Sequence, residues 1–239
     1  KLPEDRAYLQ GAAMKGAQTA LEIYTWLSDK LDVLPLGYGA NAEKVIIDSL
    51  KAHPEWSDQI VSFLWALDVT DIFRLQVIRN DKGMETVGIS HCFVNAKGTE
   101  AYGQTFMNES LSLRRLILIA VSFFEAFTGE KTIVIDDFGQ LLHPYVLTHI
   151  VEIFHANDIE SQLIVVDCNP ALLQKDLMRK DSIWFAEKGE ESSTEFVSLA
   201  DFRGMKAKQS IYDGYLQGVF GALPIESDFC FQSKVKENN

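Results

Sequence analysis

Apolar residues recur at three- and four-residue steps along the first third of the chain, and this period predicts helices. It runs through residues 4–31, where we expect one long helix. Asn41 is suited to cap a second helix that ends near residue 53, and Pro54 is suited to the first turn of a third that ends near residue 67. We therefore expect residues 1–68 to form a helical subdomain outside any sheet.

A different pattern begins near Val69, where apolar and polar residues start to alternate. Residues 71–79 and 85–94 alternate as strands do, and the Asn-Asp-Lys-Gly sequence at 80–83 has turn chemistry. This combination predicts a hairpin. A third short strand is expected over residues 101–106.

The next part of the chain alternates strand and helix patterns. Residues 111–127 carry a wide apolar helical face, and two short apolar runs rich in β-branched residues follow at 132–135 and 161–167. A helix from Pro144 to about residue 156 separates them. This spacing is typical of parallel strands joined by a crossover helix. We therefore expect an α/β lobe over residues 69–226.

The end of the chain has weaker patterns. Asn169-Pro170 is expected to open a further helix, residues 182–187 and 195–199 to form a closing hairpin, and residues 205–220 to form the last helix. Residues 227–239 are expected to be a flexible tail.

Two adjacent carboxylates, Asp136 and Asp137, follow the strand predicted at 132–135. In open α/β sheets, ligands bind outside the carboxyl ends of the strands, so acids placed there face a site. An acid at such a strand end can hold Mg²⁺, and its neighbour can orient an attacking water. The alternative interpretation is a strand followed by an ordinary polar turn.

Composition narrows the function classes. The chain has 239 residues, 47% of them hydrophobic and 23% charged, as in a folded globular protein. A net charge of −12 and an isoelectric point near 4.8 argue against a broad nucleic-acid-binding face. The three cysteines lack metal-site spacing, which favours a reduced setting. No apolar run reaches 18 residues, so we expect a cytoplasmic protein without a membrane partner.

Five segments, in this order, carry a resemblance to a known family. The sequence resembles the carboxyl-terminal part of ABC-type ATPases related to chromosome-maintenance and recombination ATPases, specifically the AAA-type ATP-binding proteins of bacterial phage-defence loci. The resemblance covers roughly residues 9–224. The segments are Asn108-Glu-Ser-Leu-Ser-Leu-Arg-Arg-Leu116, Val134-Ile-Asp-Asp-Phe-Gly-Gln-Leu-Leu-His-Pro144, Gln162-Leu-Ile-Val-Val-Asp-Cys-Asn-Pro-Ala-Leu-Leu173, Arg179-Lys-Asp-Ser-Ile-Trp-Phe-Ala-Glu-Lys188 and Gly214-Tyr-Leu-Gln-Gly-Val-Phe-Gly-Ala-Leu-Pro224.

The resemblance implies an α/β fold of the P-loop NTPase class that binds ATP and Mg²⁺. Asp136 would hold the Mg²⁺, and Asp137 occupies the catalytic position where the family normally has glutamate. Aspartate is one methylene shorter, and a misplacement of about 1 Å can cost roughly a hundredfold in rate. ATP hydrolysis is therefore expected to be impaired more than ATP binding.

The same resemblance assigns the γ-phosphate contacts of a second subunit's ATP to the signature segment. Ser110 matches the family pattern, Ser112 replaces the usual glycine, and Arg114 and Arg115 match. The physical basis is anion binding at a helix amino terminus. Cys168 stands where the family has a switch histidine. The resemblance thus implies a head-to-tail dimer, with a second copy or a homologous subunit as partner.

Other family positions depart from the pattern. Gly139 and Leu141 replace an acid and a serine in the segment after the paired carboxylates, whereas His143-Pro144 matches. No G-x-x-x-x-G-K-[S/T] phosphate loop occurs, and residues 37–44 have glycines and a lysine at the wrong spacing. We interpret that stretch as a loop and helix cap. The family's phosphate loop lies near its amino terminus, so we expect that lobe to be missing from this sequence.

Three functions follow as hypotheses. The first is an ATP-binding switch subunit that dimerises around nucleotide and regulates an effector protein in phage defence. The second is a degenerate pseudo-ATPase that acts as a scaffold, which the departures at Asp137, Ser112 and Cys168 favour. The third is a metal-dependent nuclease that uses Asp136, Asp137 and Asp167, although nothing basic nearby indicates how DNA would be held.

Overall fold

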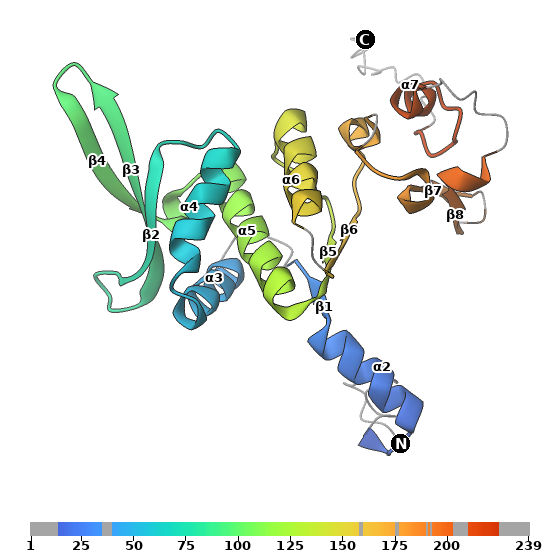
Figure 1. Cartoon of the computed structure of the whole chain (residues 1–239), viewed down its shortest axis with the longest axis horizontal. Helices are drawn as coiled ribbons and strands as arrows, with labels where there is room; N and C mark the ends of the chain where they lie inside the picture. Colours follow the sequence, from blue (N-terminus) through green and yellow to red (C-terminus); the bar gives the residue numbers. More distant parts are fainter. Residues whose placement is uncertain are drawn as a thin grey trace, which may run out of the picture. The chain divides into compact units, whose positions relative to one another are not determined.

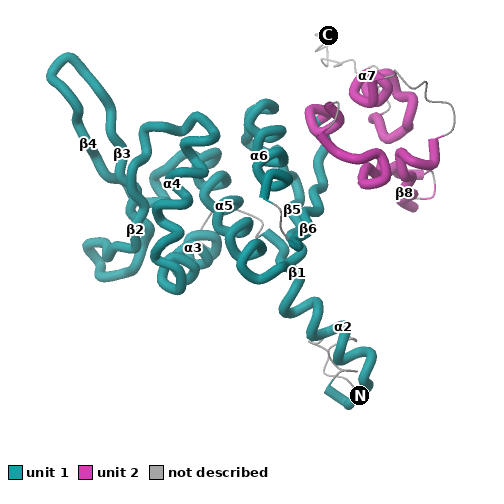
Figure 2. Tube along the Cα trace, in the orientation of Figure 1, with its two compact units in different colours: residues 1–169 teal, residues 170–239 magenta. Residues whose placement is uncertain are grey.

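The computed structural model describes residues 14–34, 40–157, 160–174, 177–189, 191, 193–202 and 210–224. The chain divides into two compact units, Lys1–Asn169 and Pro170–Asn239 (Figure 2). The division falls at Pro170, whereas the sequence suggested a boundary near Val69. The described elements form a mixed α/β fold with a three-stranded parallel sheet and antiparallel hairpins.

The parallel sheet of the first unit has the order β1-β5-β6, with β5 in the middle (Figure 1). Its strands are β1 (Leu31–Val33), β5 (Thr132–Ile135) and β6 (Gln162–Val165), and both pairings are parallel. The apolar runs at β5 and β6 were predicted as parallel strands, and this prediction is confirmed. The expectation that residues 1–68 stay outside the sheet needs correction, because β1 pairs with β5 there.

A helix was expected over residues 4–31, of which the structure describes residues 14–31. α2 spans Gln18–Asp29 and ends at Lys30, and the chain then turns into β1. The ammonium group of Lys30 donates to the carbonyl of Gly129, 2.9 Å away, at the end of helix α5 (Leu111–Gly129). Leu34, just after β1, is buried. Residues 1–13 lie outside the described part of the chain.

The second sheet is an antiparallel hairpin with a third strand, in the order β2-β3-β4. β2 spans Ile72–Arg79, β3 Glu85–Asn95 and β4 Gly98–Thr105, so the predicted hairpin is confirmed and the third strand is longer than expected. The Asn80 side chain accepts hydrogen bonds from the amides of Lys82 and Met84, both at 3.0 Å, and thereby closes the turn.

Four of the helices of the first unit match the sequence expectation closely. They are α3 (Ala40–Ala52), α4 (Trp56–Ala66), α5 (Leu111–Gly129) and α6 (Pro144–Ala156); a short 3-10 helix, η1 (Phe106–Asn108), precedes α5. α5 is the central helix of the core. Its Phe123 contacts Phe63 of α4, with ring centroids 6.2 Å apart, and Phe154 of α6, with centroids 5.1 Å apart. α5 therefore lies between α4 and α6 and packs against both helices.

β6 forms an edge of the parallel sheet. Strands of parallel sheets are normally covered on both faces, which is why their sequences are almost continuously apolar. Here Ile164 is 42% exposed, and Val166, just past the strand, is 55% exposed. β6 thus has the composition of an interior strand at an edge position.

The second unit has a small aromatic core of its own. The hairpin of β7 (Trp184–Lys188) and β8 (Thr194–Ser198) is confirmed, and Phe185 stacks on Phe220 with ring centroids 5.0 Å apart. The helix expected after Asn169 is the four-residue 3-10 helix η2 (Pro170–Leu173), and the last helix, α7, spans only Ile211–Leu216. Two further 3-10 turns are η3 (Lys180–Ser182) and η4 (Leu199–Asp201). The predicted tail at 227–239 lies outside the described residues.

Candidate functional site

The turn after β5 places both predicted acids at the carboxyl end of the middle strand. Asp136 and Asp137 are both exposed. Asp136 Oδ1 accepts a hydrogen bond from the amide of Asp137 at 3.0 Å, and the Asp137 carbonyl accepts from the amide of Gln140 at 2.9 Å. Asp137 has a φ of 48°, a left-handed conformation that aspartate tolerates better than most residues. Both carboxylates therefore face solvent on a defined backbone turn.

A buried arginine from α5 fixes this turn. Arg115 is only 3% exposed, and its Nη2 donates to the carbonyls of Asp136, Asp137 and Phe138 at 3.1, 2.7 and 3.3 Å. Three successive carbonyls converge on one guanidinium group, which has the fixed donor geometry to hold them. The sequence analysis considered Arg115 as a phosphate ligand. Its position shows that it holds the backbone beneath the acids.

A carboxylate from the neighbouring strand holds the other side of the turn. Asp167 lies just past β6; its Oδ2 accepts from the amide of Gly139, and its Oδ1 accepts from the amide of Asn169 at 2.7 Å. A Cβ atom at Gly139 would lie 2.8 Å from that Oδ2 and 2.9 Å from Leu147 Cδ2. A side chain at position 139 would clash with Asp167 and Leu147, so the turn requires glycine there. The Asp167 carboxylate accepts hydrogen bonds from backbone amides.

The amino terminus of α5 lies against the same turn. The Ser112 hydroxyl donates to the carbonyl of Leu141 at 2.8 Å. Ser110 caps the helix, and its Oγ accepts from the amide of Leu113 at 3.2 Å. The structure therefore places the start of α5 against the turn that follows the paired acids, through the hydrogen bond between Ser112 and Leu141.

Arg114 and Cys168 are the other two residues that were predicted to bind the cofactor. Arg114 turns back onto the segment before its own helix, where its guanidinium donates to the carbonyls of Met107 and Glu109 and lies 5.7 Å from the Phe106 ring centroid. Cys168 is an exposed free thiol beyond β6. His143 caps α6 through its Nδ1, which accepts from the amide of Tyr145 at 3.2 Å.

Residues 40–44 of the glycine-containing segment lie in α3, and β1 precedes that segment in the chain. We expected no strand before it, and β1 corrects that expectation. Residues 35–39 lie outside the described part of the chain, and the spacing of glycine and lysine still differs from that of a phosphate loop.

The donor set at the turn suits a cation that needs one carboxylate. Among the described residues, no three His, Cys, Asp or Glu side chains gather to hold a metal ion. Mg²⁺ in nucleotide sites commonly takes one or two carboxylates and completes its octahedral shell with water and phosphate oxygens. Asp136 fits that role, because its side chain is exposed at the strand end and its hydrogen bond with the Asp137 amide uses only Oδ1.

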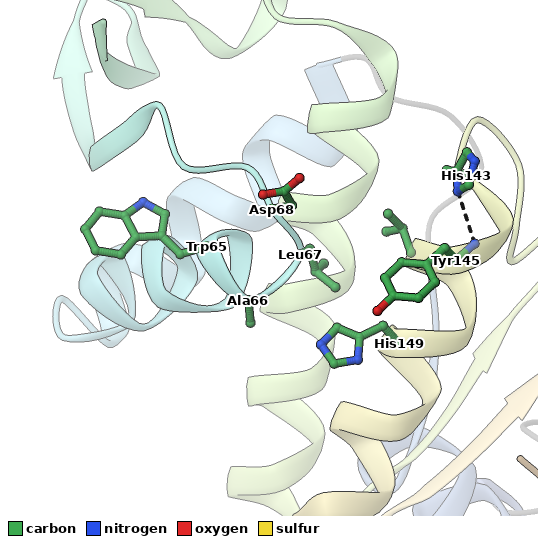
Figure 3. Close-up of a pocket in the computed structure, with 8 residues that line it drawn as sticks. Trp65, Ala66, Leu67, Asp68, His143, Tyr145 and His149 are labelled. Carbon is green, nitrogen blue, oxygen red and sulfur yellow. Dashed lines mark hydrogen bonds between the residues drawn. The ribbon is translucent and has the colours of Figure 1, made fainter. Parts of the chain in front are cut away.

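A pocket of about 610 Å³ lies between the end of α4 and the start of α6 (Figure 3). Its volume is in the range of small-molecule sites. The sequence analysis did not identify it, because its two walls are more than 70 residues apart in the chain. The residues that line it are Trp65, Ala66, Leu67, Asp68, His143, Tyr145, Val146 and His149.

A buried histidine cluster was also missed. His91 of β3 is 4% exposed; its Nδ1 lies 2.8 Å from Asp71 Oδ2, and its Nε2 lies 2.8 Å from Glu109 Oε1. Burial disfavours the charged ring, but the hydrogen bonds and charges of the two carboxylates outweigh it and raise the pKa of His91. The sequence offered no signal, since the three residues belong to separate segments.

Comparison with known proteins adds no assignment to this geometry. No helix within the described ranges is long and apolar enough to cross a membrane. No protein-family model matches the chain, and the search of curated proteins finds no match.

Proposed function

We propose that this chain is the ATP-binding, carboxyl-terminal lobe of an ABC-type switch protein that dimerises around nucleotide and regulates an effector protein in phage defence. One observation carries the proposal. The exposed Asp136 ends the middle strand of a parallel sheet, and the amino terminus of α5 is hydrogen bonded to the turn that follows it, through Ser112 and Leu141. In a head-to-tail dimer, Asp136 of one subunit would serve the Mg²⁺ and the α5 terminus of the other would serve the phosphates of the same nucleotide, so each chain must carry both parts.

In this proposal Asp136 would hold Mg²⁺, and the cation would neutralise phosphate charge. The chain's own contribution is the fixed position of that carboxylate, set by Arg115 and Asp167 on either side of the turn. Asp137 is placed to orient water, with a side chain shorter than glutamate. ATP binding is therefore the retained activity, and hydrolysis is slow.

The surroundings of the α5 terminus favour a protein partner. Met107, Leu111 and Leu141 surround it and are 43%, 47% and 45% exposed. Exposed apolar side chains that gather in one place are typical of interaction surfaces. A second subunit that docks here, head to tail, would present its nucleotide to Ser110 and Ser112.

Calorimetric titration with a non-hydrolysable ATP analogue tests the proposal. We expect binding that depends on Mg²⁺ and is lost in both Asp136→Ala and Asp136→Asn. The matched control is Asp81→Ala, which removes an exposed aspartate from the β2–β3 turn and should bind normally. Absence of binding in the wild-type protein together with the amino-terminal lobe that the family resemblance implies, with and without Mg²⁺, would reject a nucleotide switch.

A second candidate is a scaffold that keeps the fold without turnover. The use of candidate catalytic groups in internal contacts favours it: Ser110 caps its own helix, and Arg114 bonds to nearby carbonyls. A phosphate-release assay separates the two proposals. Release that disappears in Asp136→Ala rejects the scaffold, whereas binding without release supports it.

The nuclease hypothesis receives less support. Asp167 is engaged by the amides of Gly139 and Asn169, which removes one of its three proposed acids. Plasmid nicking by the purified chain in Mn²⁺, lost in Asp136→Ala, would be needed to restore it.

A further inference from the structure

His91 connects three segments that are distant in sequence. It lies on β3, Asp71 lies just before β2, and Glu109 lies between η1 and α5. Its ring also stacks on Tyr102 of β4, with centroids 4.8 Å apart and planes 5° apart. Both ring nitrogens are therefore occupied and one ring face is covered, so the side chain has a single defined orientation.

The position of His91 on β3 marks the point where the sheet loses a strand. β2 pairs with β3 only as far as Ile72, which is opposite His91. Past this point the Cys92 amide still donates to the Asp71 carbonyl at 2.7 Å, and β3 and β4 then continue as a two-stranded ribbon, residues 92–101, that projects away from the helices (Figure 1). Phe93 and Val94 of the ribbon are 43% and 82% exposed. An isolated two-stranded ribbon is only marginally stable by itself. Its orientation therefore depends on the contacts made where it joins the rest of the sheet, at His91.

The other end of the cluster is the start of α5. Glu109 is 8% exposed and immediately precedes Ser110, the cap of that helix. The backbone of Glu109 is held as well, because its amide donates to the Phe106 carbonyl at 3.1 Å and its carbonyl accepts from Arg114 Nε at 3.0 Å. A displacement of the Glu109 side chain is therefore transmitted to the first turn of α5.

We propose that His91, clamped between Asp71 and Glu109, couples the direction of the projecting ribbon to the amino terminus of α5. A movement of the α5 terminus then moves the ribbon, and a movement of the ribbon moves the α5 terminus. Coupling of this kind is reciprocal. The inference goes beyond the proposed function, because it holds whether or not nucleotide binds at that terminus.

The protonation state of His91 controls the clamp. A charged imidazole donates from both nitrogens and satisfies both carboxylates at once, whereas a neutral ring can donate to only one of them. The groups that face the ring are Asp71, Glu109 and Tyr102, and within the described residues neither carboxylate forms an ion pair with another cation. Loss of the proton therefore releases one side of the clamp.

Hydrogen exchange resolved by peptide tests the coupling in the full chain. The two readouts are the amides at the start of α5, residues 111–116, and the amides of the ribbon. In the wild type, the exchange rates of both sets, corrected for intrinsic exchange, should rise together by about fivefold as the pH rises through the titration of His91. In His91→Gln and in Glu109→Gln both should be loose at every pH. His149→Gln, which changes a half-buried histidine of α6 paired with Glu152, should keep the wild-type profile.

Histidine NMR on the wild-type chain gives a second measurement that needs no variant. The ring resonances of His91 and the amide shifts of both segments should share one midpoint. Ribbon amides that follow the titration while the α5 amides do not, or two different midpoints, would overturn the coupling. Nucleotide binding, measured separately by calorimetry, bears on the proposed function alone, so the two ideas fail independently.

Discussion

The guanidinium group of Arg115 lies 2.7 Å from the carbonyl oxygen of Asp137 and ties the central helix of the core to the turn that carries both acids. The contact is made to the backbone, so the Asp137 side chain stays exposed. A charged, buried donor thus stabilises an acidic turn without neutralising its carboxylates.

Removal of Arg115 should destabilise the fold strongly. Arg115→Leu would leave the carbonyls of Asp136, Asp137 and Phe138 without this donor, and we expect a loss of about 2–4 kcal/mol in the free energy of unfolding. Urea denaturation followed by circular dichroism measures it. Arg74→Leu changes an exposed arginine of β2 and should cost about 0.5 kcal/mol or less. Equal losses in the two variants would contradict the assigned role.

Gly139→Ala should be costly for a steric reason. The new methyl group would lie 2.8 Å from Asp167 Oδ2 and 2.9 Å from Leu147 Cδ2, so the turn must shift. We expect a loss of about 1–3 kcal/mol in thermal or urea unfolding. Gly103→Ala is the matched control, because its methyl group would find its nearest atom, the Ile89 carbonyl oxygen, at 3.8 Å. A neutral Gly139→Ala would show that the turn is pliable.

The stability of the protein should depend on the charge of His91. Its folded-state pKa is raised above the ordinary value of 6.5, so the stabilisation is fully present below about pH 6.5 and is lost as the pH rises through the folded-state pKa. Unfolding curves collected across this range should show the decline. In His91→Gln the decline should be absent, and stability near pH 6 should be lower by about 2–4 kcal/mol. A wild-type protein that gains stability over the same range through this group would contradict the assignment.

Asp137→Glu should raise ATP turnover if the switch proposal is correct. The longer side chain restores the reach of the usual water-orienting acid, and we expect phosphate release to increase by about tenfold or more. Glutamate is less suited to the left-handed backbone at this position, so a small loss of thermal stability should accompany the gain. The double variant with Asp136→Ala should release no phosphate. Unchanged release in Asp137→Glu would favour the scaffold.

Local sequence patterns were sufficient to predict most of the helices and strands of the first unit. β5 and β6 were predictable because short β-branched runs flank a helical period, and the β2–β3 hairpin was predictable from its Asn-Asp-Lys-Gly turn. β1 was not, because Leu31-Asp-Val33 has only three residues and continues the apolar period of the helix before it. Its strand conformation comes from pairing with Thr132–Val134, a partner 100 residues away.

The acids of the candidate site were predictable, and the groups that hold them were not. Asp136 and Asp137 follow an apolar run, which is a signal within a few residues. The roles of Arg115, Asp167 and His91 depend on contacts between segments about 20–30 residues apart or on separate strands, and nothing in their immediate sequence distinguishes them from surface charges.

The open side of β6 has a practical consequence for handling the purified chain. Among the described strands β6 is the last in the parallel sheet, and Ile164 and Val166 beside it are exposed, so this edge can pair with a strand of a neighbouring molecule, more often as the concentration rises. The strong negative charge of the chain opposes that stacking at low ionic strength. Added salt should therefore promote clumping of this acidic protein, and a lysine introduced at Ile164 should keep it dispersed.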